Sequence, residues 1–138
     1  MNIVNMLLFW ARSMPRHPAI IQPELTLSYA QLGQAIEAAA EYFARSALGP
    51  SQPIAVAISN PTKMMIASLG LFRAGFSVVP ANQRLLEHLP TVGVTAMVGE
   101  RNGVTLSGGT NILFDDAWLS VVASKRSEEH RLNSSHRH

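Results

Sequence analysis

Asn60, Pro80 and Asn82 are the residues best placed to bind a substrate, because each follows an apolar segment typical of a buried strand. Asn60 follows residues 54–58, and Pro80 and Asn82 follow residues 76–79. In an open parallel sheet the carboxyl ends of the strands share one edge, and ligands bind in the crevice outside it. The alternative role is structural, since asparagine is a good helix N-cap and proline can end a strand.

The other residue types that often carry chemistry have no partner at a suitable spacing. A Gly-rich turn can cradle phosphates, but no lysine follows residues 107–110 (SGGT), so we interpret them as a tight turn between two short strands. The adjacent Asp115 and Asp116 start a helix and point to different faces, which favours capping. His17 and His88 lack partners at metal-ligand spacing, and the chain has no cysteine. We therefore predict no catalytic, cofactor-binding or metal-binding residue.

Hydrophobic periodicity predicts the elements that position these residues. Helical spacing and capping signals predict helices between Asn2 and Pro15 and over residues 29–47, 61–74, 85–92 and 115–122. Short apolar segments predict a small hairpin or a bent strand pair over 19–22 and 25–27, strands over 54–58, 76–79 and 95–98, and weaker strands over 104–106 and 112–114. Strands without polar alternation, separated by helices, are typical of parallel sheets with right-handed crossovers. The predicted fold class is α/β, with a partial parallel sheet and helices on both faces.

The charge of the chain is concentrated at its C-terminal end. The 138 residues carry a net charge of +2, but residues 1–124 hold seven basic and seven acidic side chains, so the excess lies in residues 125–138. Residues 1–124 have no basic excess with which to neutralise phosphates, and this argues against a nucleic-acid partner. The length suits one domain, which we assign to residues 1–124.

No segment is expected to cross a membrane. The longest apolar run, residues 64–72, is stopped by Arg73 well short of the roughly 20 residues that a spanning helix needs. The apolar start has neither a preceding positive charge nor a small-residue cleavage site, so we expect no export signal. Together with the lack of cysteine, this predicts a cytoplasmic protein.

Three segments resemble motifs of adenylate-forming (AMP-binding) enzymes. Residues 27–32 (LSYAQL) resemble the T-Y-x-E-L opening of that family, and residues 54–61 (IAVAISNP) resemble its V-A-I-x-x-x-N strand. Residues 71–85 (LFRAGFSVVPANQRL) resemble its L-x-A-G-x-x-x-V-P-x-N-x-R-L segment, in the form typical of acyl-CoA and aryl-CoA synthetases. Peptide-synthetase adenylation domains usually carry A-Y-V-P-x-D there. One departure is residues 51–53 (SQP), which replace the usual Gly-Asp before the V-A-I strand.

The resemblance covers residues 2–122 and implies only the opening part of the large N-terminal domain. The full enzyme would use ATP and magnesium to convert a carboxylic acid into an acyl-adenylate, and would then pass the acyl group to CoA. By resemblance, the sheet edge with Asn60 and Asn82 faces the acyl and pantetheine site. The family's phosphate loop ending in Pro-Lys-Gly, its adenine-binding motifs and its C-terminal lysine are absent from this sequence. We therefore expect a fragment that is itself inactive and holds no cofactor.

Residues 125–138 resemble no part of that family. Residues 126–136 (RSEEHRLNSSH) show no hydrophobic period. Back-translation of residues 126–130 gives AGA TCG GAA GAG CAC, the start of a common sequencing adaptor, and one dropped base continues the match through residue 136. We interpret residues 125–138 as a non-native or disordered tail, whose histidines have no functional role.

Two alternative functions remain open from the sequence. A stand-alone, non-catalytic α/β module would bind a ligand or a partner through the same sheet edge and would be a soluble monomer. A fragment of a peptide-synthetase adenylation domain would differ only downstream of the missing phosphate loop. The fragment interpretation predicts self-association, because a sheet cut before its remaining strands exposes an unpaired edge and apolar helix faces.

Overall fold

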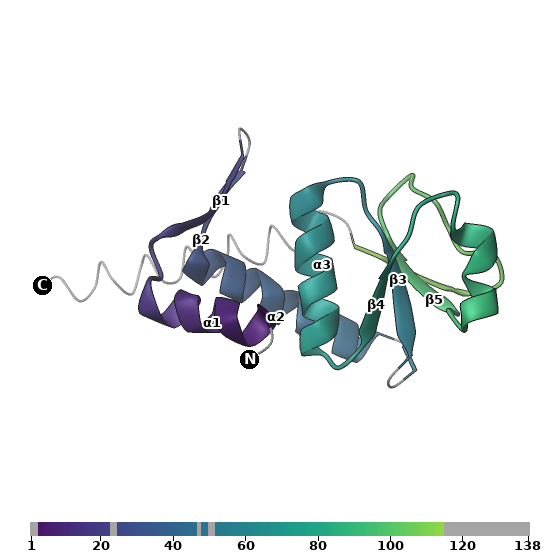
Figure 1. Ribbon diagram of the computed structural model, residues 1–138, viewed down its shortest axis with the longest axis horizontal. Helices are drawn as coiled ribbons and strands as arrows, with labels where there is room; N and C mark the ends of the chain where they lie inside the picture. The colour runs from purple at the N-terminus through teal and green to yellow at the C-terminus, as the bar shows by residue number, and fades with distance from the viewer. Residues whose placement is uncertain (1–2, 23–24, 47, 50–51, 115–138) are drawn as a thin grey trace, which may run out of the picture.

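The structure is a computed structural model that describes residues 3–22, 25–46, 48–49 and 52–114 (Figure 1). Its elements, in which η marks a 3₁₀ helix, are α1 (Ile3–Ser13), β1 (Pro18–Gln22), β2 (Leu25–Ser28), α2 (Tyr29–Arg45), β3 (Pro53–Ala57), α3 (Pro61–Arg73), β4 (Ser77–Pro80), η1 (Leu86–His88), η2 (Pro90–Val92), β5 (Ala96–Gly99) and β6 (Thr110–Leu113). None of the helices in these ranges combines the length and apolar character that crossing a bilayer requires.

A four-stranded parallel sheet organises the C-terminal half of these elements. The strand order is β4-β3-β5-β6, and every neighbouring pair is parallel. The chain passes from β3 through α3 to β4, and then returns across β3 through η1 and η2 to β5. The first connection leads to the strand on one side of β3, and the second leads to the strand on its other side. The two connections also cover opposite faces of the sheet. They therefore have the same hand, as the right-handed rule for parallel strands requires. The predicted α/β class with a partial parallel sheet is confirmed.

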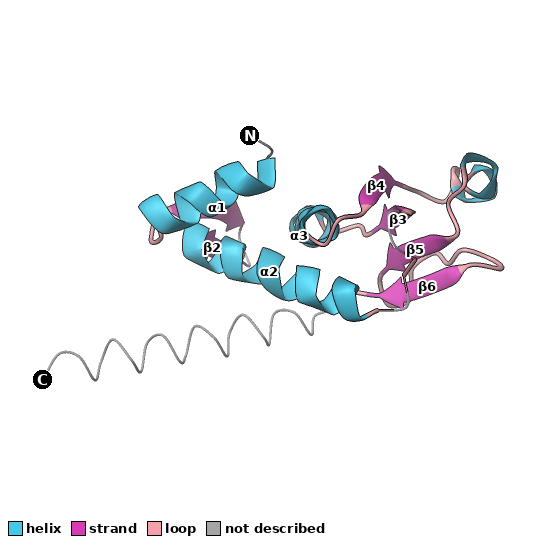
Figure 2. Cartoon of the chain, turned by 90° about the horizontal axis from the view of Figure 1, so that it is seen from below, coloured by secondary structure: helices cyan, strands magenta, loops and turns pink. Residues whose placement is uncertain are grey.

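Alternate residues of β3 and β5 point to opposite faces of the sheet and build two cores. Ile54, Val56 and Val98 belong to the larger core under α2 and α3, while Ala55 and Met97 belong to the smaller core. All five are fully buried, which explains why these strands are continuously apolar in sequence. The smaller core is closed by the segment around η1 and η2 and by the loop before β6, and no α-helix of the described chain covers it (Figure 2).

Two glycines allow α1, α2 and α3 to approach one another closely. A Cβ at Gly70 of α3 would lie 2.6 Å from Ala39 Cβ of α2, and a Cβ at Gly33 of α2 would lie 3.1 Å from Ala11 Cβ of α1. The first distance is below any ordinary contact, and the second is tight. Gly70 therefore fixes the α2–α3 spacing, and Gly33 the α1–α2 spacing.

The predicted hairpin is present as β1 and β2, which pair antiparallel and project away from the sheet (Figure 1). β2 leads directly into α2 through a capping box. The Ser28 hydroxyl accepts the Gln31 N–H at 3.2 Å, and Gln31 Oε1 accepts the Ser28 N–H at 2.9 Å. This reciprocal pair satisfies two N–H groups at the helix start, which is why α2 begins at Tyr29 as predicted.

Two predicted elements are wrong. Residues 85–92 form two 3₁₀ helices and not one continuous helix, because Pro90 lacks the N–H that an α-helix would need there. Residues 104–106 form no strand. The N–H and C=O groups of Leu106 bond to the Asn111 side chain at 2.8 and 2.9 Å, so no neighbouring strand pairs with them. The helix predicted over 115–122 and the tail over 125–138 lie outside the described residues.

Candidate functional site

The ends of three parallel strands bring the predicted site residues to one edge of the sheet. Val56 of β3 pairs with Pro80 of β4, and Ala57 pairs with Gly99 of β5, so the residues after these strands lie on the same side. Asn60, Pro80 and Asn82 are all exposed there. The structure therefore places these three residues along the predicted edge, and their binding role stays a prediction.

Asn60 is the N-cap of α3. Its Oδ1 accepts the N–H groups of Thr62 and Lys63 at 3.0 and 3.1 Å, and Pro61 occupies the first helical position. The acceptor side of the Asn60 amide is thus used inside the protein, which leaves its Nδ2 group as the part that can contact a ligand. The structural role considered for Asn60 is therefore observed.

Asn82 has a similar role in the turn after β4. Its Oδ1 accepts the N–H groups of Arg84 and Leu85 at 3.0 and 3.2 Å, as in an Asx turn. Pro80 is the last residue of β4, and the N–H of Ala81 makes the next bond to β3 at 2.9 Å. Both residues therefore shape how the chain leaves the sheet.

Glu100 is a polar residue at this edge that sequence reasoning missed. Its Oε1 accepts the Ser59 N–H at 3.0 Å, which ties the end of β5 to the end of β3. Its place just after the strand predicted over 95–98 is the signal that could have identified it. The three strand ends are thus held by bonds from side chains to backbone.

The backbone N–H groups at the start of α3 and in the Gly-rich turn already have acceptors within the chain. Asn60 already occupies the N–H groups at the start of α3, which would otherwise attract a phosphate. In the Gly-rich turn, the N–H groups of Gly109 and Thr110 donate to the carbonyls of Leu106 and Thr95 at 3.4 and 2.9 Å. Within the described ranges, no three His, Asp or Glu side chains are arranged to hold a metal ion.

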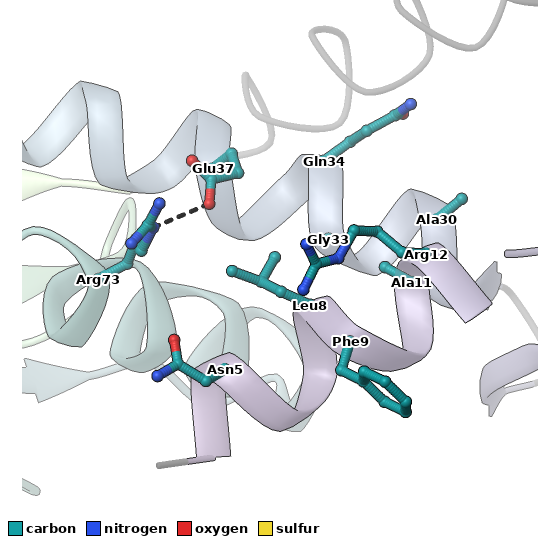
Figure 3. Close-up of a pocket in the computed structure, with 10 residues that line it drawn as sticks. All are labelled: Asn5, Leu8, Phe9, Ala11, Arg12, Ala30, Gly33, Gln34, Glu37 and Arg73. Atoms are coloured by element: carbon teal, nitrogen blue, oxygen red, sulfur yellow. Dashed lines mark hydrogen bonds and ion pairs between the residues drawn. The ribbon is translucent and has the colours of Figure 1, made fainter. Parts of the chain in front are cut away.

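A separate groove lies where α1, α2 and α3 meet (Figure 3). Its volume is about 710 Å³, and Leu8, Ala11 and Gly33 are among its lining residues. At one end Arg73 Nε donates to Glu37 Oε1 at 2.9 Å. Arg73 ends α3 whereas Asn60 begins it, so this groove and the strand-end region are separated by the length of that helix.

Comparison with known proteins identifies the family. The family model described as "AMP-binding enzyme" matches residues 8–91. Over 82% of its length the chain is 27% identical to phosphinothricin tripeptide synthetase PhsC of Streptomyces viridochromogenes, and this match spans 11% of that synthetase. It is also 34% identical to surfactin synthase subunit 1 of Bacillus subtilis, over 46% of this chain and 2% of that protein.

Solved structures of two related proteins share the fold. The N-terminal subdomain of Klebsiella oxytoca NpsA superposes with a TM-score of 0.72 at 16% identity, covering 88% of this chain and 32% of that one. O-succinylbenzoate coenzyme A synthetase (MenE) from Bacillus subtilis gives a TM-score of 0.70 at 21% identity, covering 83% and 32%. The chain thus spans about a third of these structures. Because the family model covers most of the sequence, and the fold agrees, this protein belongs to the AMP-binding enzyme family.

Proposed function

We propose that residues 1–124 are the opening part of the large domain of an enzyme that activates a carboxylic acid. In such an enzyme the carboxylate attacks the α-phosphorus of ATP, which yields an acyl-adenylate and releases pyrophosphate. The thiol of CoA then attacks the acyl carbon and releases AMP. We further propose that this chain alone catalyses neither step.

The observation that carries the proposal is that the polar side chains at the strand ends are already bonded to the backbone of this chain. Oδ1 of Asn60, Oδ1 of Asn82 and Oε1 of Glu100 all accept backbone N–H groups of this chain. A part that supplied the reacting groups would keep such atoms available for substrate. The described residues therefore support a scaffold role, in which the edge is fixed and other residues complete the site.

Two classes of acid-activating enzyme fit this scaffold. Residues 76–82 (FSVVPAN) favour an acyl-CoA synthetase, and a CoA synthetase is among the proteins that share the fold. The similarity to PhsC over 82% of the chain favours a peptide synthetase as the second candidate. We propose the acyl-CoA synthetase, because residues 76–82 lie in the segment whose sequence usually differs between acyl-CoA synthetases and peptide-synthetase adenylation domains.

Pyrophosphate exchange into ATP tests the inactivity of the chain. The purified chain would be incubated with ATP, magnesium, labelled pyrophosphate and panels of aliphatic acids, aromatic acids and amino acids, beside a complete acyl-CoA synthetase as a positive control. We expect no exchange above the protein-free background. Acid-dependent exchange that is removed by EDTA would contradict the proposal, and the active panel would show which acid class the chain accepts.

A further inference from the structure

Helix α1 is apolar on two sides, and only one of them is covered. Leu7 and Leu8 pack against the larger core. Four large apolar side chains, which we call the outer face of α1, are 43%, 47%, 37% and 36% exposed: Met6, Phe9, Trp10 and Met14. A helix that is apolar all round is normally buried. Within the described residues, the outer face is therefore an apolar surface left open to solvent.

The outer face is continuous and is held in place by ring contacts. Its residues lie three, four and eight positions after Met6, which places them on one side of a helix. The Trp10 ring centroid lies 5.6 Å from that of Phe9 and 6.3 Å from that of Tyr29 on α2. In Figures 1 and 2, α1 lies on the outside of the described structure. The outer face is thus presented outward.

The groove beside α1 does not receive the side chains of the outer face. Figure 3 places the Arg12 guanidinium over the middle of the groove, and the Phe9 ring points away from it. The apolar side chains of α1 therefore project outward next to a cation. This arrangement favours insertion of these side chains into an apolar phase over insertion of a partner into the groove.

The basic charge of residues 1–124 is concentrated beside this face. Residues 1–23 contain Arg12 and Arg16 and no acidic residue, whereas residues 24–124 contain five basic and seven acidic residues. The net charge is therefore +2 before residue 24 and −2 after it. Both arginines are exposed, and within the described ranges neither side chain has a hydrogen-bond or ion-pair partner. A negatively charged surface would thus attract the α1 end of the chain and repel the rest.

We propose that α1 docks on an anionic phospholipid membrane, with its outer face in the acyl-chain boundary and with Arg12 and Arg16 on lipid phosphates. Tryptophan and phenylalanine on one side of a helix, with arginines beside them, are typical of helices that lie in a membrane interface. Glu37, the carboxylate of the neighbouring groove, is already paired with Arg73 at 2.9 Å. One short helix gives reversible, peripheral binding. This docking goes beyond acid activation and does not depend on it.

Flotation of the full chain with vesicles tests the docking and separates bound protein from aggregates. Vesicles with equal parts of phosphatidylcholine and phosphatidylglycerol should bind the chain about tenfold more strongly than vesicles of phosphatidylcholine alone. A high concentration of sodium chloride should weaken this binding, because salt screens the attraction. Equal binding to both kinds of vesicle would overturn the proposal, since it would show apolar contact without charge recognition.

Substitution of Phe9 tests the apolar part of the contact. Phe9→Glu should lower the partition coefficient onto anionic vesicles about tenfold or more, because it places a carboxylate in the membrane interface. Val92→Glu is the matched control, since Val92 is 66% exposed on η2, at the opposite end of the structure from α1 (Figure 1). It should stay within about twofold of the unmodified chain. Far-UV circular dichroism checks that each variant is folded.

Substitution of the two arginines tests the charged part. Arg12→Gln combined with Arg16→Gln should lower the partition coefficient about thirtyfold, since each cation at an anionic surface contributes roughly fivefold. Arg45→Gln combined with Arg84→Gln removes the same charge from exposed arginines at the end of α2 and after β4. This control should lose about threefold at most. Equal losses in the two double variants would show that only net charge matters, and would overturn the assignment to α1.

The fluorescence of Trp10 reports whether α1 itself enters the membrane. The chain has two tryptophans, and Trp118 lies outside the described residues, so Trp118→Phe leaves Trp10 as the single probe. Its emission should shift to shorter wavelength on anionic vesicles, and brominated acyl chains should quench it. Binding without this shift would place the contact elsewhere on the chain. Absence of binding to anionic vesicles would also overturn the proposal, and a protein would then be the occupant to test.

Discussion

The Tyr42 hydroxyl donates a 2.7 Å hydrogen bond to the backbone carbonyl of Leu113, 71 positions further along the chain. Phe114 packs beside it, with its ring centroid 5.5 Å from that of Phe43 and 6.4 Å from that of Tyr42. The C-terminal turn of α2 therefore holds the edge strand β6. This contact stabilises the end of the sheet and occupies one of its open backbone acceptors.

Tyr42→Phe should lower the free energy of unfolding by about 0.5–1.5 kcal/mol, the usual contribution of one hydrogen bond. The ring packing on Phe114 is kept, so the loss reports on the hydroxyl alone. Urea denaturation followed by circular dichroism gives the value. Tyr29→Phe is the matched control, and an equal loss there would remove the special role of the Tyr42 hydroxyl.

Gly70→Ala should destabilise the protein by about 1–3 kcal/mol, because the new Cβ would lie 2.6 Å from Ala39 Cβ and push α2 and α3 apart. Gly33→Ala meets Ala11 Cβ at 3.1 Å, and its higher helix propensity offsets part of the strain. Thermal unfolding should rank Gly70→Ala clearly below Gly33→Ala. The reverse ranking would show that the α1–α2 contact, and not the α2–α3 contact, sets the helix spacing.

Asn60→Ala should cost about 1 kcal/mol of stability, because α3 loses the acceptor that caps Thr62 and Lys63. Asn60→Ser keeps a capping oxygen and should lose much less. Chemical denaturation of the two variants distinguishes these cases. If both lose the same amount, the cap observed at Asn60 contributes nothing to stability.

Glu100→Ala should destabilise the protein by about 0.5–1.5 kcal/mol, since the Ser59 N–H loses its acceptor at 3.0 Å. Glu100→Gln retains an oxygen there and should be less affected. Hydrogen exchange at the Ser59 amide is the direct readout. Its protection should fall in Glu100→Ala, and unchanged protection would mean that the bond between β5 and β3 is not formed in solution.

The predictable part of the fold depends on local signals. α2 was predictable because Ser28 and Gln31 form a capping box before an apolar stripe, and β3 and β5 because strands buried on both faces are continuously apolar. Residues 104–106 were mispredicted because their apolar pattern suits a strand, whereas Leu106 is satisfied by the Asn111 side chain. The spacing of the apolar residues does not reveal that a side chain, and not a neighbouring strand, bonds to Leu106.

The site was predictable in position but not in detail. The places of Asn60 and Asn82 followed from the strand ends, since parallel strands share one carboxyl edge. The Glu100–Ser59 bond and the Glu37–Arg73 pair join residues 41 and 36 positions apart, so the first depends on how β5 pairs with β3 and the second on how α3 packs against α2. The groove between α1, α2 and α3 has no motif in sequence for the same reason.

Reading the genomic DNA downstream of codon 124 tests the central claim most directly. If residues 1–124 are the opening part of an acid-activating enzyme, the native frame continues into a Ser/Thr/Gly-rich loop that ends in Pro-Lys-Gly. A native gene that encodes residues 125–138 as given and then stops would contradict the account. The stand-alone binding module would then be the function to test.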